Sequence, residues 1–126
     1  MIDIIKPSLL QEVNMLYQVE PYKIPQEIPS TGEVIGYDIQ YPEFTELKCY
    51  RIMKKLFDLG IRLDIDEDET YNILCLDNSD RIHPEFVFSE ESDTLEECML
   101  KVLLTLHDEI LESSQQAIRD ELEKEI

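Results

Sequence analysis

Two stretches in the first half of the chain repeat apolar residues at the three- and four-residue spacing of an α-helix. The first follows a capping box formed by Ser8 and Gln11 and predicts a short helix over about 8–18. The second covers 43–60, where six apolar side chains form one stripe and Gly60 supplies the left-handed conformation that ends many helices. Both helices are therefore amphipathic, with one side available to a core.

A third helical pattern begins at Thr94, which forms a second capping box with Glu97 and starts a long apolar stripe. The segment 113–126 is more polar but keeps helical spacing at Ala117, Ile118, Leu122 and Ile126. We expect it to be either the extension of a long C-terminal helix or a frayed tail. As an extension, it would present Ile118 and Leu122 as a seam for a second copy of the chain or for a partner.

Residues 1–41 differ in character from the rest of the chain. Three prolines, at positions 21, 25 and 29, each lack a backbone donor and disfavour helix in the residue before them, so they end the first helix. They leave either a linker or an extended proline-rich arm. The partial alternation of apolar residues in 31–40 then predicts an edge strand.

Between the second and third helical patterns, the period changes to that of a β-strand. Residues 61–66 alternate aliphatic with charged side chains, 71–76 are apolar on both faces, and 85–89 carry two phenylalanines on one side. Turn-forming residues separate these strands, which predicts a meander. Residues 42–112 are thus predicted to form an α+β domain of order αβββα. Its three-stranded antiparallel sheet would carry helices either on both faces or on one.

The order of the segments Pro42–Gly60, Ile61–Leu76 and Glu85–Leu111 resembles the small αβββα sandwich domains found among uncharacterised bacteriophage and prophage proteins. This resemblance covers a little over half of the chain and lies in element order and apolar pattern. The double-stranded-RNA-binding fold has the same element order, but it needs basic residues where this chain has Glu96 and Glu97. An RNA-binding role is therefore excluded.

Eleven basic residues stand against twenty-nine acidic ones, and the formal net charge is −18. A surface this negative repels phosphate, which argues against nucleic acid as a partner, and its field favours a cationic protein. The segment 41–60 is the exception, with four basic and three acidic residues. There Lys48, Arg51 and Lys55 share one helix face, either for internal charge balance or as a small anion-binding patch.

One acidic stretch matches the first half of a calcium-binding loop. Asp64, Asp66 and Asp68 stand at alternate positions, as the first ligands of such a loop do. The match then fails, because Glu69 occupies the position that requires glycine and Cys75 the position that requires a bidentate glutamate. We therefore predict no metal site and interpret these carboxylates as the acidic surface of a hairpin, with weak non-specific cation binding as the alternative.

No catalytic constellation is evident from the sequence. The three cysteines, Cys49, Cys75 and Cys98, lie in apolar periodic segments of an acidic chain, which is typical of reduced core thiols and not of nucleophiles. His83 and His107 have no second histidine or cysteine at metal-binding spacing. With only three glycines, no phosphate-binding loop is available. We expect no enzyme activity and no cofactor.

The sequence therefore predicts an acidic protein-interaction module, of phage or mobile-element type, that binds a basic surface of a protein partner and imitates nucleic acid as an inhibitor. The predicted contact residues are Asp64, Asp66, Glu67, Asp68, Glu69, Ile118 and Leu122. The alternative is a structural or assembly protein that self-associates through its terminal segments. No apolar run reaches bilayer length and residues 1–6 contain no leader, so we expect a cytoplasmic protein.

Overall fold

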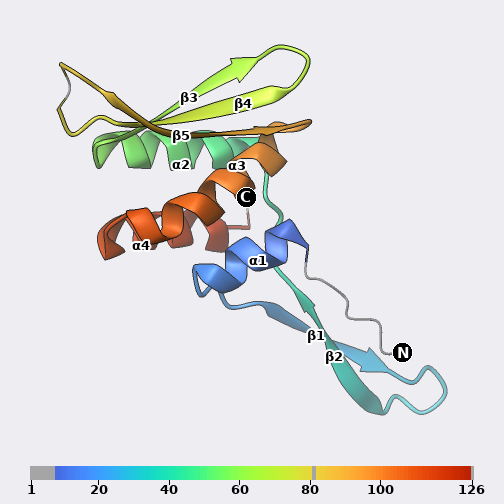
Figure 1. The fold of residues 1–126 in the computed structure, drawn as a ribbon. Helices are drawn as coiled ribbons and strands as arrows, with labels where there is room; N and C mark the ends of the chain where they lie inside the picture. Colours follow the sequence, from blue (N-terminus) through green and yellow to red (C-terminus); the bar gives the residue numbers. More distant parts are fainter. Residues whose placement is uncertain (1–7, 81, 126) are drawn as a thin grey trace, which may run out of the picture.

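Four α-helices and two antiparallel sheets form the part of the chain that the computed structural model describes, residues 8–80 and 82–125 (Figure 1). The α+β class is thus confirmed, whereas the predictions for residues 1–6 and for Ile126 lie outside the described residues. In chain order the elements are α1 (Leu9–Leu16), β1 (Tyr22–Glu27), β2 (Val34–Gln40), α2 (Glu46–Asp58), β3 (Ile61–Glu67), β4 (Tyr71–Asp77), β5 (Glu85–Ser92), α3 (Leu95–Leu106), the 3-10 turn η1 (His107–Glu109) and α4 (Glu112–Glu123).

Strands β3, β4 and β5 form the predicted meander, with β4 in the centre. Helices α2 and α3 both pack on one face of this sheet, α2 against β3 and α3 against β4 and β5 (Figure 1). Alternation along the strands explains the choice of face, because Leu63, Ile73 and Cys75 point toward the helices and are buried. Of the two arrangements that the sequence allowed, the structure therefore has the one-sided one.

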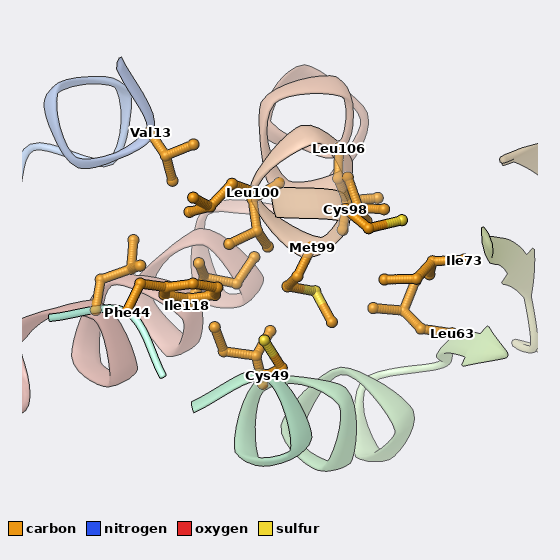
Figure 2. Packing of buried hydrophobic residues seen from close by; sticks show 14 of the residues in the cluster. Val13, Phe44, Cys49, Leu63, Ile73, Cys98, Met99, Leu100, Leu106 and Ile118 are labelled. Atoms are coloured by element: carbon orange, nitrogen blue, oxygen red, sulfur yellow. The ribbon is translucent and has the colours of Figure 1, made fainter. Parts of the chain in front are cut away.

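Helix α3 lies at the centre of the core. Figure 2 shows Met99 between Cys49 of α2 and the strand residues Leu63 and Ile73, while Leu100 points toward Val13 of α1. Seven of the twelve residues of α3 are buried, so this helix is covered on most of its circumference. A helix buried in this way needs neighbours on several sides, which α1, α2 and the sheet supply.

The prediction of one long C-terminal helix is wrong. Helix α3 and the turn η1 end at Ile110, where the backbone is extended (φ −118°, ψ 159°), and α4 begins after Leu111. Helix α4 then packs against α2. This turn in the chain allows Ile118 and Leu122 to be buried in the same core as α3, at 1% and 2% exposure. A straight extension would have left them in water.

The proline-rich segment pairs with the predicted edge strand. Residues 22–27 form β1 and residues 34–40 form β2, joined in an antiparallel hairpin with a bulge between Gln26 and Glu27. In Figure 1 this hairpin projects from the side of the molecule away from the three-stranded sheet. All of its β1 residues are exposed. We call it the arm.

Candidate functional site

Carboxylates from four elements gather at one end of the three-stranded sheet. We call this region the acidic end and define it by ten residues: Glu46, Asp66, Glu67, Asp68, Glu69, Glu90, Glu91, Asp93, Glu96 and Glu97. The end of β3 and the turn that follows it supply four of them, and the end of β5 with the start of α3 supplies five.

Strand register brings these segments together. Glu67 pairs with Tyr71 across the β3–β4 turn, and Tyr71 in turn pairs with Ser92 of β5. The Thr70 hydroxyl donates a hydrogen bond of 2.5 Å to a carboxylate oxygen of Glu91, which joins the turn to β5. Glu46 lies in the first turn of α2, and Glu96 and Glu97 lie in the first turn of α3. Carboxylates at these positions are stabilised by the positive end of a helix dipole.

The field of this cluster acts on the tyrosine at its centre. The pKa of Tyr71 is raised because its hydroxyl is hydrogen-bonded to Glu67 and because the negative charges of Glu67, Glu46 and Glu96 oppose a phenolate. From Leu63 to Leu106 the sequence holds two basic residues, Arg81, which lies outside the described residues, and Lys101. Lys101 donates to the backbone carbonyl of Glu91 at 3.1 Å. Lys101 thus places one cation beside ten carboxylates, and the acidic end keeps a strongly negative potential.

The sheet face that carries no helix continues this surface. Asp64 and Asp66 point to it from β3, opposite Leu74 and Asn72 of β4. Phe86 on β5 pairs with Leu76 and is 60% exposed. Phe86 lies near the opposite end of the sheet, however, because Leu76 pairs with Arg62 at the start of β3, so it is not part of the acidic end.

The structure brings the five predicted acidic contact residues together and separates them from the two aliphatic ones. Asp66, Glu67, Asp68 and Glu69 are exposed at the β3–β4 turn, and Asp64 lies further along β3, ion-paired with Arg62 at 2.8 Å. Ile118 and Leu122 are instead buried in the core. They cannot contact a partner while α4 is packed, so we remove them from the candidate site.

The sequence match of Asp64, Asp66 and Asp68 to a calcium-binding loop does not correspond to a cluster of ligands in the structure. Among residues 8–80 and 82–125, no group of three or more histidine, cysteine, aspartate or glutamate side chains could hold a metal ion. Asp64 and Asp66 belong to a regular strand paired with β4, which holds them in an extended row. A calcium loop must instead curve its ligands around the ion.

The thiols are buried and poorly acidic. Burial is the main cause that raises the pKa of Cys49 to about 12 and that of Cys75 to about 11, and it also raises the pKa of Cys98. All three cysteines are free. Because the thiolate is the nucleophilic form, none of them is suited to catalysis at neutral pH.

A buried ionic cluster between α2 and α4 was not predicted from the sequence. Glu121 is 1% exposed, and one of its carboxylate oxygens accepts hydrogen bonds from Lys55 at 3.0 Å and Lys124 at 2.8 Å. Lys48 is fully buried nearby. Among the described residues, neither the Lys48 ammonium nor the second Glu121 oxygen has a hydrogen-bond partner. Burial lowers the pKa of Lys48, although the charge of Glu121 partly offsets this.

This cluster lies beside a hollow of about 700 Å³, lined by Arg51, Lys54, Lys55, Asp58, Glu121, Lys124 and Glu125. Burial opposes ionisation of Glu121, but the hydrogen bonds from Lys124 and Lys55 outweigh it and hold the pKa of Glu121 below its usual value. The basic face of α2 thus neutralises a carboxylate of the same chain. Internal charge balance explains Lys48 and Lys55 better than an anion-binding patch does.

No helix among the described residues has both the length and the apolar character needed to cross a bilayer.

Comparison of the chain with family models, with curated proteins and with solved structures gave no match. The resemblance to bacteriophage αβββα domains thus stays a prediction from element order.

Proposed function

We propose that this protein is a small acidic interaction module, without catalytic activity, that binds a basic surface of a protein partner through its acidic end. The single observation that supports this most strongly is the convergence of carboxylates from β3, β5, α2 and α3 on one exposed end of the sheet. The three buried free thiols are consistent with a cytoplasmic protein.

The physical basis of recognition would be electrostatic. A dense, weakly neutralised carboxylate cluster attracts a cationic surface over a distance of about one Debye length, roughly 8–10 Å at physiological salt. This accelerates association and selects against acidic partners. The rigidity of the sheet fixes the spacing of Asp66, Glu67 and Asp68, so the cluster could take the place of phosphates on a protein that handles nucleic acid.

The proposal is tested by capture with charge-matched variants. Three proteins would each be immobilised on a resin and exposed to a bacterial lysate at low salt. They are the wild type, a variant neutralised at the acidic end (Glu67→Gln with Asp68→Asn) and a control (Glu20→Gln with Glu109→Gln). Both variants change the net charge from −18 to −16, and all four residues are exposed. Only the location of the lost charges differs between them.

We expect wild type and control to retain the same cationic protein, which high salt releases, and the acidic-end variant to retain about tenfold less. Capture by all three chains alike would show that net charge, and not the acidic end, is responsible. If wild type retains nothing that salt releases, the proposed function is wrong.

A further inference from the structure

The arm has one face whose apolar side chains stay largely exposed among residues 8–80 and 82–125. Alternation along each strand places Lys23, Pro25 and Glu27 of β1 on this face, together with Ile35, Tyr37 and Ile39 of β2, although a bulge pairs Glu27 with Val34 and leaves Ile35 without a partner on β1. We call these six residues the arm face. Lys23 pairs with Ile39 and Pro25 with Tyr37, so the apolar residues form a continuous stripe with a charge near each end.

The large apolar side chains of the arm face are exposed to solvent. Ile35, Tyr37 and Ile39 are 66%, 62% and 56% exposed. The other face of the hairpin is more polar, because Gln26 donates a 2.6 Å hydrogen bond to Asp38, and it is attached to the body through the hydrogen bond from Tyr22 to Glu125. A two-stranded hairpin is marginally stable alone in water. Three large apolar side chains in a row thus indicate a surface that packs against something.

We infer that the arm face packs against the arm face of a second copy of this protein, around a two-fold axis perpendicular to the strands. In that arrangement β1 lies over β1 of the second copy in the opposite direction, and Tyr37 lies over Tyr37. Contacts of this kind are self-complementary, because the same patch serves both subunits. This inference goes beyond the proposed function and uses a different surface.

Charge complementarity favours a second copy as the occupant. Lys23 and Glu27 stand at opposite ends of the same strand, with Pro25 midway between them. When two β1 strands cross in opposite directions, Lys23 of each copy lies over Glu27 of the other. The arm face therefore pairs its own two charges across the interface and leaves neither facing a like charge.

The same geometry reduces the repulsion between two strongly negative molecules. Each copy carries a net charge of −18, so a dimer must keep the acidic surfaces apart. The arm projects from the side of the molecule away from the three-stranded sheet (Figure 1). Opposed arms place the two bodies at opposite ends of the contact, where salt screens their repulsion.

The area of the contact determines its strength. A hairpin with strands of six and seven residues is roughly 20 Å long and two strands wide, so face-to-face packing would bury about 500 Å² on each copy. The total of roughly 1,000 Å² is the lower limit for a specific interface. We therefore expect a weak, reversible dimer with a dissociation constant on the order of 10–100 μM.

The test is sedimentation of the full chain across a range of concentrations. We expect the mass to rise from 14.9 kDa toward twice that value for wild type. Tyr37→Ser should weaken the dimer at least tenfold, whereas Ile24→Ser, on the opposite face of the arm and 45% exposed, should leave it unchanged. Because these side chains are exposed, each variant should melt at the wild-type temperature.

Charge reversal provides the sharpest part of the test. Lys23→Glu and Glu27→Lys should each weaken the dimer, because like charges then face one another, and the double variant should restore it. A wild-type chain that stays at 14.9 kDa up to about 1 mM would overturn the inference. So would a dimer that Tyr37→Ser leaves intact, or a double variant that fails to recover.

Salt separates this inference from the proposed function. Raising the ionic strength should weaken binding to a basic partner steeply, whereas the dimer should change little, because salt screens the Lys23–Glu27 pairs and the repulsion between the two acidic bodies at the same time. Either result can therefore fail without the other.

Discussion

At the scale of single residues, the most consequential feature is the buried carboxylate of Glu121. Its hydrogen bond from Lys55 links α4 to α2, its hydrogen bond from Lys124 lies at the end of α4 itself, and its charge accompanies the buried ammonium of Lys48. A buried ion is costly when a partner is removed, because the remaining charge has no compensation. The cluster therefore makes the docking of α4 sensitive to one side chain.

We predict that Glu121→Gln lowers the free energy of unfolding by about 1–3 kcal/mol at neutral pH. Folding lowers the pKa of Glu121 below its ordinary value of 4.5. The contribution of the Glu121 charge to stability is therefore complete above pH 4.5 and is lost as the pH falls through the lower pKa of the folded protein. The difference between wild type and variant in urea melts should thus shrink in acid. Glu123→Gln, which removes an exposed pair with Arg119, is the control and should cost less than 1 kcal/mol.

The buried thiols give a second prediction. At pH 8 the folded protein should react with a thiol reagent far more slowly than the unfolded chain does, because the pKa of Cys49 is about 12 and that of Cys75 about 11 and both side chains are buried. Complete labelling of all three cysteines should require denaturant. Rapid labelling of any one of them without denaturant would contradict the core described here.

Local chemistry explains which residues could be predicted from the sequence. The capping residues Ser8 and Thr94 act as expected, since each accepts a hydrogen bond from the backbone three residues later. The burial of Lys48 could not be predicted in the same way. It depends on α4 covering α2, which is a tertiary contact that leaves no mark on the spacing of residues within α2.

At the scale of elements, α4 decides how the C-terminal segment is used. A seam for a partner requires Ile118 to be exposed, whereas the structure buries it completely. Burial of an isoleucine contributes about 1.5–3 kcal/mol, and its truncation leaves a cavity as well. Helix α4 is thus part of the core and not an attached tail.

We predict that Ile118→Ala destabilises the protein by about 2–4 kcal/mol. Leu111→Ala, in the connection before α4 and 77% exposed, removes a similar apolar side chain and should change the stability by less than about 0.5 kcal/mol. Denaturant melts of the two variants measure the difference. Equal effects would mean that α4 is not packed as described.

The elements with sustained regular spacing were predicted from the sequence, whereas the strand β1 and the break between α3 and α4 were missed. The meander of β3 to β5 follows from period-two alternation, and α2 from a sustained apolar stripe. The strand β1 was missed because Pro25 weakens any strand pattern and Glu27 falls at a bulge. The break between α3 and α4 was missed because helical spacing continues on both sides of it.

At the scale of the whole molecule, two lysines compensate a buried carboxylate, while most carboxylates of the acidic end are exposed. Lys55 and Lys124 are bound to Glu121, while the exposed Glu67, Asp68 and Glu69 gather at the acidic end. The sequence predicted the excess of negative charge and the acidic β3–β4 turn. It could not predict that β5, α2 and α3 would add carboxylates to the same end, because only the fold brings them together.

The direct measurement is the dissociation constant of the captured partner, determined with purified proteins at two salt concentrations for wild type, the Glu67→Gln/Asp68→Asn variant and the Glu20→Gln/Glu109→Gln control. We predict that wild type and control bind with equal affinity, which falls steeply with salt, and that the acidic-end variant binds about tenfold more weakly with a shallower dependence on salt. Equal affinities and equal salt dependence for all three chains would contradict the acidic end as the binding surface.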